Sequence, residues 1–159
     1  MKTSPPSLQV LIAGGGIAGL TAAVAFASRG YSVRLFERAP GFAEIGAGLQ
    51  LSSNATRLLR RLGVLDRLMP AAVRPQAVVL REARDLSELG RVPLGQVAER
   101  RWGAPYLTVH RADLQSALLA RAEQDPDITI ETGAAVRDVA FHARGVTLSI
   151  DRNGAIEEA

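Results

Sequence analysis

The chain has no cysteine and only two histidines, His110 and His142, among its 159 residues. Without cysteine there can be no disulfide, no thiol redox chemistry and no cysteine metal site. Two histidines are too few for a histidine-rich metal centre. The sequence therefore predicts no metal site.

Aromatic residues make up only 4% of the chain, and the basic residues are almost all arginines scattered along it. The formal net charge is +3 and the isoelectric point about 10.1. A surface that binds nucleic acid combines aromatic stacking with a continuous basic groove. We therefore expect no nucleic-acid partner, despite the basic composition.

Long apolar runs are also missing, because glycine or arginine interrupts each one well short of a membrane span. Residues 3–7 are polar or proline, where the apolar part of a signal peptide would begin. We expect no membrane partner and a cytoplasmic location. The length and the apolar fraction of 47% suit one globular domain with a core.

The first forty residues have the pattern of a βαβ unit. The apolar run Leu8–Ala13 predicts a strand, and Gly14–Gly19 then fits the motif G-x-G-x-x-G. A small-residue helix is expected at Leu20–Arg29 and a second strand at Ser32–Phe36, which ends on Glu37. This order of elements is typical of a dinucleotide-binding site.

Each motif residue has a mechanical task. Gly14 allows a sharp turn, Gly16 allows the backbone to approach a pyrophosphate, and Gly19 allows close packing of helix and strand. Ile17 and Ala18 of the motif are also expected to contact the cofactor. The N-terminus of the helix that follows offers free N–H groups and a positive dipole end to the phosphates.

Glu37 stands eighteen residues after Gly19. A carboxylate at this position accepts hydrogen bonds from ribose hydroxyls, which favours FAD or NAD over a cofactor with a 2′-phosphate. The motif therefore predicts a dinucleotide but does not decide between FAD and NAD.

The rest of the chain predicts alternating helices and strands. The expected elements are an extended passage at Ile45–Leu51, helices at Ala55–Leu62, Val64–Met69 and Asp113–Gln124, and strands at Ala77–Leu80, Arg91–Leu94, Tyr106–Val109, Ile128–Glu131, Ala135–Phe141 and Val146–Ile150. Asp151–Gly154 is a hairpin-turn signal, and Trp102 is expected in a loop. Because the third strand of this meander is left uncapped, we expect the sequence to be a fragment, natural or otherwise.

Three stretches together resemble the FAD-binding portion of the group A flavoprotein monooxygenases, the aromatic-ring hydroxylases. They are the dinucleotide motif ending on Glu37-Arg38, the passage 46–55 (GAGLQLSSNA) and the passage 110–114 (HRADL). The second stretch is most similar to the salicylate hydroxylase and 3-hydroxybenzoate 6-hydroxylase branch. The resemblance covers essentially the whole chain. It implies an α/β fold over residues 1–159: a Rossmann-like FAD-binding domain with a β-meander and part of a second β-rich layer, truncated.

The resemblance also implies roles for individual residues. Glu37 would hold the adenosine ribose, Arg38 would lie near the adenine, and Val136 would offer its backbone to the adenine. At the flavin end, Ala47 and Gly48 would run close to the isoalloxazine, and Arg111 would contact the ribityl-pyrophosphate region. A guanidinium suits that task because it donates two parallel N–H bonds to phosphate or hydroxyl oxygens.

By the same resemblance, the intact protein would be an NAD(P)H-dependent monooxygenase. It would hydroxylate a small aromatic acid or phenol with dioxygen, through a flavin hydroperoxide, and a homodimer is compatible with the sequence. The family's later Asp-Gly and Gly-Asp motifs are absent from this sequence, so we expect the chain alone to be inactive. No catalytic acid or base is identifiable.

Two alternatives stay open at this point, an NAD-dependent oxidoreductase and an inactive nucleotide-binding fragment. The sequence does not name the aromatic substrate or the position hydroxylated, and it does not choose between NADH and NADPH. It also leaves the oligomeric state open.

Overall fold

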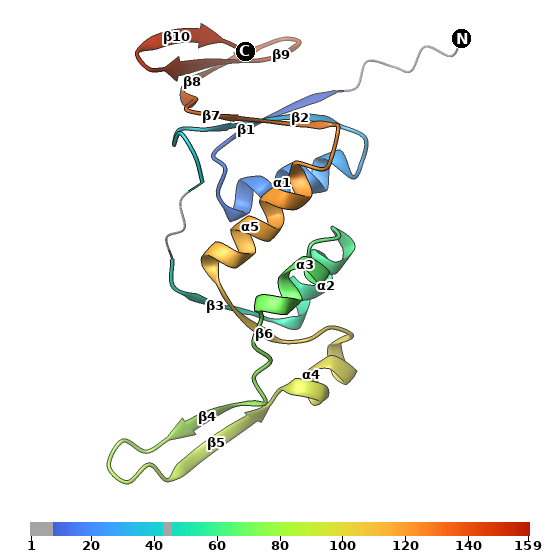
Figure 1. The fold of residues 1–159 in the computed structure, drawn as a ribbon, viewed down its shortest axis with the longest axis vertical. Helices are drawn as coiled ribbons and strands as arrows, with labels where there is room; N and C mark the ends of the chain where they lie inside the picture. Colours follow the sequence, from blue (N-terminus) through green and yellow to red (C-terminus); the bar gives the residue numbers. More distant parts are fainter. Residues whose placement is uncertain (1–7, 43–45) are drawn as a thin grey trace, which may run out of the picture. The chain divides into compact units, whose positions relative to one another are not determined.

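The computed structural model describes residues 8–42 and 46–159 (Figure 1). The helices are α1 (Ile17–Ala27), α2 (Ser53–Arg61), α3 (Leu65–Leu68), α4 (Gly95–Trp102) and α5 (Arg111–Ala122), with a 3-10 turn η1 at Met69–Ala71. The strands are β1 (Gln9–Ala13), β2 (Ser32–Glu37), β3 (Gly48–Leu51), β4 (Ala77–Arg81), β5 (Glu88–Pro93), β6 (Leu107–His110), β7 (Ile128–Thr132), β8 (Ala135–His142), β9 (Gly145–Arg152) and β10 (Ala155–Glu158).

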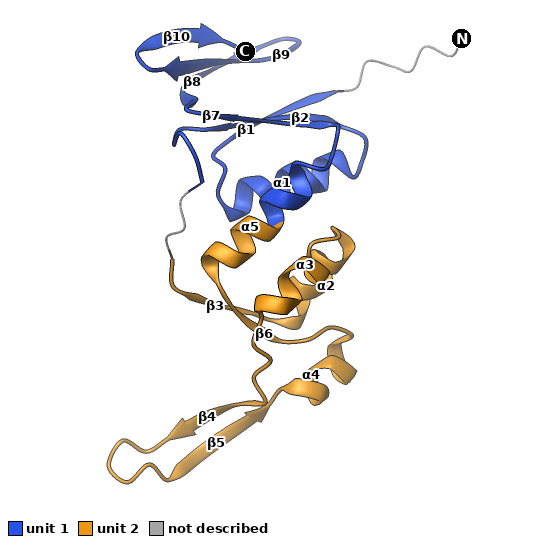
Figure 2. Ribbon diagram, viewed as in Figure 1, with its two compact units in different colours: residues 1–44, 118–159 blue, residues 45–117 orange. Residues whose placement is uncertain are grey.

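The chain divides into two compact units (Figure 2). Unit 1 contains residues 1–44 and 118–159, and unit 2 contains residues 45–117. Each unit is described by itself below.

Unit 1 is built on a parallel sheet in the order β1-β2-β7. Helix α1 packs on β1 and β2 through a stripe with helical spacing, formed by Leu20, Ala23, Val24 and Ala27. The expected βαβ unit is confirmed. The helix begins at Ile17, three residues earlier than predicted, because the turn after the second motif glycine is already helical.

The C-terminal part of unit 1 is an antiparallel meander in the order β8-β9-β10. Asn153 and Gly154 connect β9 to β10 with φ of 55° and 90°. Two successive positive φ angles define the type I′ turn that joins twisted strands most readily. The predicted hairpin turn is confirmed, and Leu148 and Ile150 of β9 pack with Phe36 in one apolar cluster.

Unit 2 holds two separate antiparallel pairs, β3 with β6 and the hairpin β4–β5, together with α2, α3 and α4. Thr56 of α2 is fully buried, and its Oγ1 donates to the carbonyl of Pro105 at 2.6 Å. This bond ties α2 to the segment that leads into β6.

Several expectations for unit 2 need correction. Helix α4 was not predicted, and Trp102 is its last residue rather than part of a loop. Strand β5 begins at Glu88, three residues before the predicted start, because it pairs with β4 in a hairpin with a bulge. Helix α2 begins at Ser53 rather than at Ala55. Ile45, the start of the predicted extended passage, lies outside the described residues.

Candidate functional site

The glycine-rich loop has the geometry expected of its motif. Gly14 has a φ of +101°, which strongly favours glycine, and its N–H donates to the carbonyl of Phe36 at 2.7 Å. A Cβ on Gly19 would lie 1.9 Å from the carbonyl oxygen of Gly14, so no other residue fits there. A Cβ on Gly16 would meet nothing within 4 Å. The loop backbone is therefore packed tightly against Gly19, whereas the space beside Gly16 is open.

The first backbone bond of α1 runs from the Leu20 N–H to the Gly16 carbonyl at 2.9 Å. The N–H groups of Ile17, Ala18 and Gly19 precede it and have no acceptor within the helix. The first turn contains no acidic side chain, and Gly16 supplies no side-chain cap. These donors and the positive end of the helix dipole suit a phosphate.

Glu37 at the end of β2 reaches back to this loop. Its Oε2 accepts from the Gly15 N–H at 2.6 Å, and its Oε1 accepts from the Ala39 N–H at 2.8 Å. A carboxylate has about four acceptor sites, so capacity remains for ribose hydroxyls. The structure brings together the motif and its acid, as the sequence predicts.

Gly15 is a residue that the sequence analysis missed, because it occupies a variable position of G-x-G-x-x-G. A Cβ there would lie 2.6 Å from Phe42 Cε1 and 3.1 Å from Glu37 Cβ. The run of three consecutive glycines was the available signal.

Arg38 and strand β8 meet at one cavity of about 320 Å³ in unit 1. Arg38, Ala135 and Arg137 line it. The Val136 side chain packs instead against the apolar cluster, because successive strand residues face opposite sides. Only the backbone of Val136 is available on that side, which is the part of the residue that the sequence analysis assigned.

Arg111 and the passage Gly46-Ala47-Gly48 are brought together in unit 2. The Arg111 N–H donates to the Ala47 carbonyl at 3.1 Å, and Gly48 pairs with His110 across β3 and β6. A Cβ on Gly46 would lie 2.6 Å from the Cβ of Arg111, so the arginine stem needs a glycine beneath it.

The exposed Arg111 side chain forms no ion pair with any described residue. It begins α5, where a cation opposes the helix dipole. An anionic ligand beside Arg111 would offset the repulsion between its guanidinium and the positive end of the helix dipole. The predicted site residues thus fall into two groups, one in each unit.

Neither histidine joins a site. His110 is exposed, and the exposed His142 contacts Thr147 Oγ1 through its Nε2 at 3.1 Å. Over residues 8–42 and 46–159 the structure contains no group of acidic and histidine side chains that could hold a metal ion. No helix in those ranges has the length and apolar character to cross a membrane.

The glycine loop, the free start of α1 and the acid that ends β2 define a Rossmann-type dinucleotide-binding protein. The family model described as "FAD binding domain" matches residues 7–158. The chain belongs to this family, and its resemblance to the FAD-binding portion of group A flavoprotein monooxygenases is confirmed.

Curated relatives are aromatic-ring monooxygenases. The 3-hydroxybenzoate 6-hydroxylase of Polaromonas naphthalenivorans (strain CJ2) is 43% identical over 124 residues, 78% of this chain and 31% of the relative. The 3-amino-4-hydroxybenzoate 2-monooxygenase of Streptomyces cremeus is 41% identical over 128 residues, 80% of this chain and 32% of the relative. The chain spans about a third of the length of these curated relatives.

Solved structures agree on the fold. The tetrameric form of 2-methyl-3-hydroxypyridine-5-carboxylic acid oxygenase superposes with a TM-score of 0.76 at 28% identity, covering 98% of this chain and 38% of that one. The p-nitrophenol 4-monooxygenase PnpA of Pseudomonas putida DLL-E4 gives a TM-score of 0.83 at 16% identity, with 96% of this chain and 38% of that one covered. The expected α/β class is confirmed.

Proposed function

We propose that residues 1–159 form the FAD-binding domain of a longer NAD(P)H-dependent monooxygenase that hydroxylates a small aromatic acid or phenol. The observation that carries the proposal is the glycine loop, which has open space beside Gly16 and is hydrogen-bonded to the carboxylate of Glu37. The family match and the names of the relatives support the choice of FAD and of an aromatic substrate.

In this proposal the two ends of the adenosine diphosphate have separate partners in unit 1. The N–H groups of Ile17 and Ala18 hold the pyrophosphate, with Gly14, Gly16 and Gly19 shaping the loop around it. Each oxygen of Glu37 keeps its backbone donor and accepts a ribose hydroxyl with its remaining lone pairs.

Arg38 and the backbone of Val136 hold the adenine from the rim of the cavity in unit 1. In unit 2, Ala47 and Gly48 line the flavin ring, and Arg111 binds the ribityl-pyrophosphate region. Bound FAD would supply the redox chemistry between NAD(P)H and dioxygen, and dioxygen would be the source of the oxygen that enters the ring. The chain's own residues bind and orient FAD.

The remaining parts of the proposal concern the whole protein. Its substrates would be an aromatic ring and dioxygen, with NAD(P)H as the reductant. We propose a cytoplasmic homodimer without a nucleic-acid or membrane partner, although one solved relative is described as tetrameric. No residue of this chain is assigned a catalytic role, and the isolated chain is not expected to hydroxylate a substrate.

A flavin titration tests the proposal. The chain should bind FAD saturably, followed by flavin fluorescence. Gly16→Ala should weaken binding about tenfold or more, because the new methyl group enters the space assigned to the pyrophosphate. The variant should unfold at the same temperature, since its Cβ meets no atom of the protein.

Gly145→Ala is the matched control, because this glycine of β9 also has open space around its Cβ and no positive φ. Its affinity for FAD should equal that of the wild type. A chain that binds NAD and ignores FAD would overturn the proposal in favour of an NAD-dependent oxidoreductase.

A further inference from the structure

The ring of Phe42 covers one residue of the glycine-rich loop in unit 1. A Cβ on Gly15 would lie 2.6 Å from Phe42 Cε1 and 3.0 Å from Phe42 Cζ, so the ring rests directly on the Gly15 backbone. Gly15 is buried, whereas Gly14 is exposed and Gly16 is half-buried. A Cβ on either of these two neighbours would meet no atom of the described residues within 4 Å. The ring therefore covers the middle glycine of the three.

The backbone under this ring carries the hydrogen bond that joins the loop to the acid of β2. The Gly15 N–H donates to Glu37 Oε2 at 2.6 Å. A Cβ on Gly15 would also lie 3.1 Å from the Cβ of Glu37, so the ring, the loop and the stem of the acid meet at one point. An apolar cover excludes water that would compete for this bond and lowers the local dielectric constant, which strengthens a charge-assisted hydrogen bond.

The segment just before Phe42 is fixed by two hydrogen bonds. The Ala39 N–H donates to Glu37 Oε1 at 2.8 Å, and the Ala39 carbonyl accepts from the Gly133 N–H at 2.9 Å. Pro40 then restricts the backbone by its fixed φ. These constraints hold the chain that leads to Phe42 against the ends of β2 and β7.

Core packing alone does not account for this position of the ring. Phe42 is half-buried and is not part of the apolar cluster formed by Phe36, Ala134, Leu148 and Ile150. A ring can lie this close to the backbone only where the residue beneath it lacks a Cβ. The contact between Phe42 and Gly15 thus depends on both residue types.

We propose that Phe42 is a positioning residue for the dinucleotide. Its ring shields the hydrogen bond from the Gly15 N–H to Glu37 from water, which keeps the carboxylate in the place where it accepts the ribose. Phe42 acts through Glu37 and does not itself bind the cofactor. The inference rests on the proposed function, in which Glu37 accepts a ribose hydroxyl.

Amide hydrogen exchange, followed by NMR on the full chain, tests the shield without a ligand. Phe42→Ala should raise the exchange rate of the Gly15 amide about three- to tenfold, because water reaches its hydrogen bond. The Gly14 amide is the internal reference, since it donates to the Phe36 carbonyl at 2.7 Å and a general loosening of unit 1 would raise both rates.

Two further variants calibrate the exchange measurement. Phe42→Leu keeps an apolar cover and should restore most of the protection of Gly15. Phe141→Ala is the matched control, because this phenylalanine of β8 is 82% exposed, and it should leave the Gly15 rate unchanged.

ADP and 2′-deoxy-ADP, titrated by calorimetry, test the effect on the ribose. Phe42→Ala should weaken the binding of ADP about three- to tenfold. The loss for 2′-deoxy-ADP should be smaller, because this ligand lacks the 2′-hydroxyl that an acid at this position accepts. A purely structural defect would weaken the binding of both ligands equally.

A double-mutant cycle shows whether Phe42 acts through Glu37. Once Glu37→Ala has removed the carboxylate, Phe42→Ala should cause no further loss of ADP affinity. Additive losses from the two substitutions would overturn the inference, since the ring would then act independently of the acid.

Far-UV circular dichroism shows whether each variant folds. If Phe42→Ala does not fold, Phe42→Val gives the same comparison with a smaller apolar cover, and its Gly15 amide should exchange faster than that of Phe42→Leu.

The two measurements separate this inference from the proposed function. If the wild type binds neither FAD nor ADP, the proposed function is overturned, and the exchange rate of Gly15 still decides the role of Phe42. If FAD binds but the Gly15 rate is the same in the wild type and Phe42→Ala, the inference alone is overturned.

Discussion

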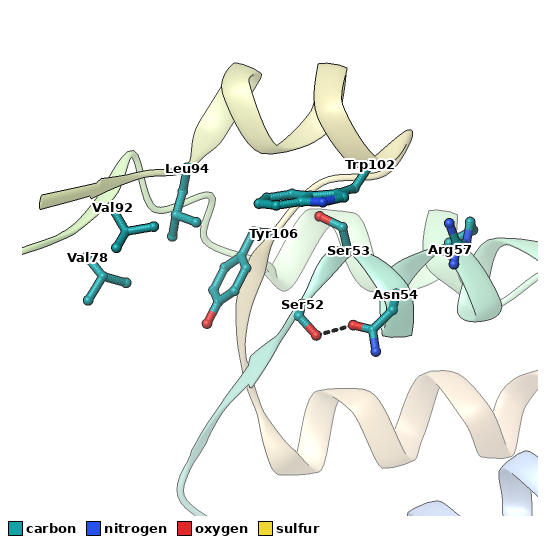
Figure 3. A pocket seen from close by; sticks show the side chains of 9 residues that line it. All are labelled: Ser52, Ser53, Asn54, Arg57, Val78, Val92, Leu94, Trp102 and Tyr106. Carbon is teal, nitrogen blue, oxygen red and sulfur yellow. Dashed lines mark hydrogen bonds between the residues drawn. The ribbon is translucent and has the colours of Figure 1, made fainter.

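The glycine-rich loop of unit 1 and the cavity of unit 2 are built in opposite ways. The loop of unit 1 is made of backbone, because Gly14, Gly16 and Gly19 expose peptide groups and the helix start adds N–H donors. Unit 2 has a cavity of about 490 Å³ that is lined by side chains from the β4–β5 hairpin, the start of α2 and the end of α4 (Figure 3). A backbone site leaves glycines at fixed spacing in the sequence, whereas a cavity lined by ordinary valines and serines leaves no such mark.

The units also differ in how their strands are covered. In unit 1 the side chains of Leu35 and Phe36 are essentially inaccessible, since α1 and β9 pack on β2. In unit 2 the hairpin residues Val78, Leu80 and Val92 are all about half exposed or more. A two-stranded hairpin is marginal by itself, so the β4–β5 hairpin contributes little to the apolar burial of unit 2, which comes from residues such as Leu68 and Leu107.

A matched pair of leucines gives the largest expected contrast. Leu35→Ala in β2 should lower the free energy of unfolding by about 2–5 kcal/mol, because it opens a cavity in a buried sheet. Leu80→Ala in β4 should change it by less than about 0.5 kcal/mol, since that side chain is 64% exposed. Urea unfolding followed by circular dichroism measures both, and equal losses would contradict the contrast.

Glu37 is the acidic side chain that bonds to the glycine-rich loop of unit 1, and its substitution tests how much a side chain adds to this backbone site. Glu37→Ala should weaken FAD binding by about 1.5–3 kcal/mol, the range for hydrogen bonds to a charged group. Glu37→Gln should cost less, because its amide oxygen still accepts. Reconstitution titrations give both values, and an unchanged dissociation constant for Glu37→Ala would remove this residue from the site.

Glu37 also holds the N–H groups of Gly15 and Ala39, so Glu37→Ala is expected to lower thermal stability as well. Far-UV circular dichroism before each titration separates a folding defect from a loss of ribose contacts.

In unit 2 a single buried hydrogen bond is expected to contribute measurably to the free energy of unfolding. Thr56→Val keeps the volume but removes the donor to the Pro105 carbonyl, which becomes unsatisfied in a buried position. The free energy of unfolding should fall by about 1–3 kcal/mol. Arg61→Gln, at an exposed position of α2, serves as the control. An unchanged free energy of unfolding in Thr56→Val would show that this hydrogen bond does not stabilise unit 2.

The smallest effect concerns acid sensitivity in unit 1. The guanidinium of Arg137, which donates to Asp151, lowers the pKa of that carboxyl, and the Gly154 N–H adds to the effect. Since the folded pKa is below the unfolded one, this stabilisation is present at neutral pH and is lost as the pH falls through the folded pKa.

Asp151→Asn should therefore flatten the acid limb of a plot of melting temperature against pH. Arg137→Gln should raise the pKa of Asp151 toward its ordinary value, which an NMR titration of the carboxyl measures. An unaltered titration in Arg137→Gln would assign the lowered pKa to the turn alone.

The same contrast explains which parts the sequence predicted. The strand, glycine loop and helix of unit 1 can be predicted because each depends on residues close together in the sequence. The turn at Asn153-Gly154 can be predicted for the same reason, since these two residues favour the positive φ angles that it needs. Helix α4 follows no such rule. It begins at Gly95 with a φ of +54° and buries only Ala98, so it has no apolar stripe to detect.

The cavity of unit 2 was equally beyond the sequence. Ser53, which lines it, has no distinguishing pattern, and the burial of its hydroxyl depends on contacts between elements distant along the chain. The pairing of Gly46 with the stem of Arg111 is of the same kind, because a helix start and a loop 65 residues earlier meet only after folding.

The two hydrogen bonds that the Glu37 carboxylate accepts from backbone N–H groups have a consequence for ligand affinity. Both carboxylate oxygens are already fixed by backbone donors, so the side chain has little rotational freedom left to lose when a ribose arrives. Immobilising a flexible side chain on binding costs about 0.5–1.5 kcal/mol. Folding has already ordered this one, so the cofactor meets a rigid acceptor and keeps more of its interaction free energy as affinity.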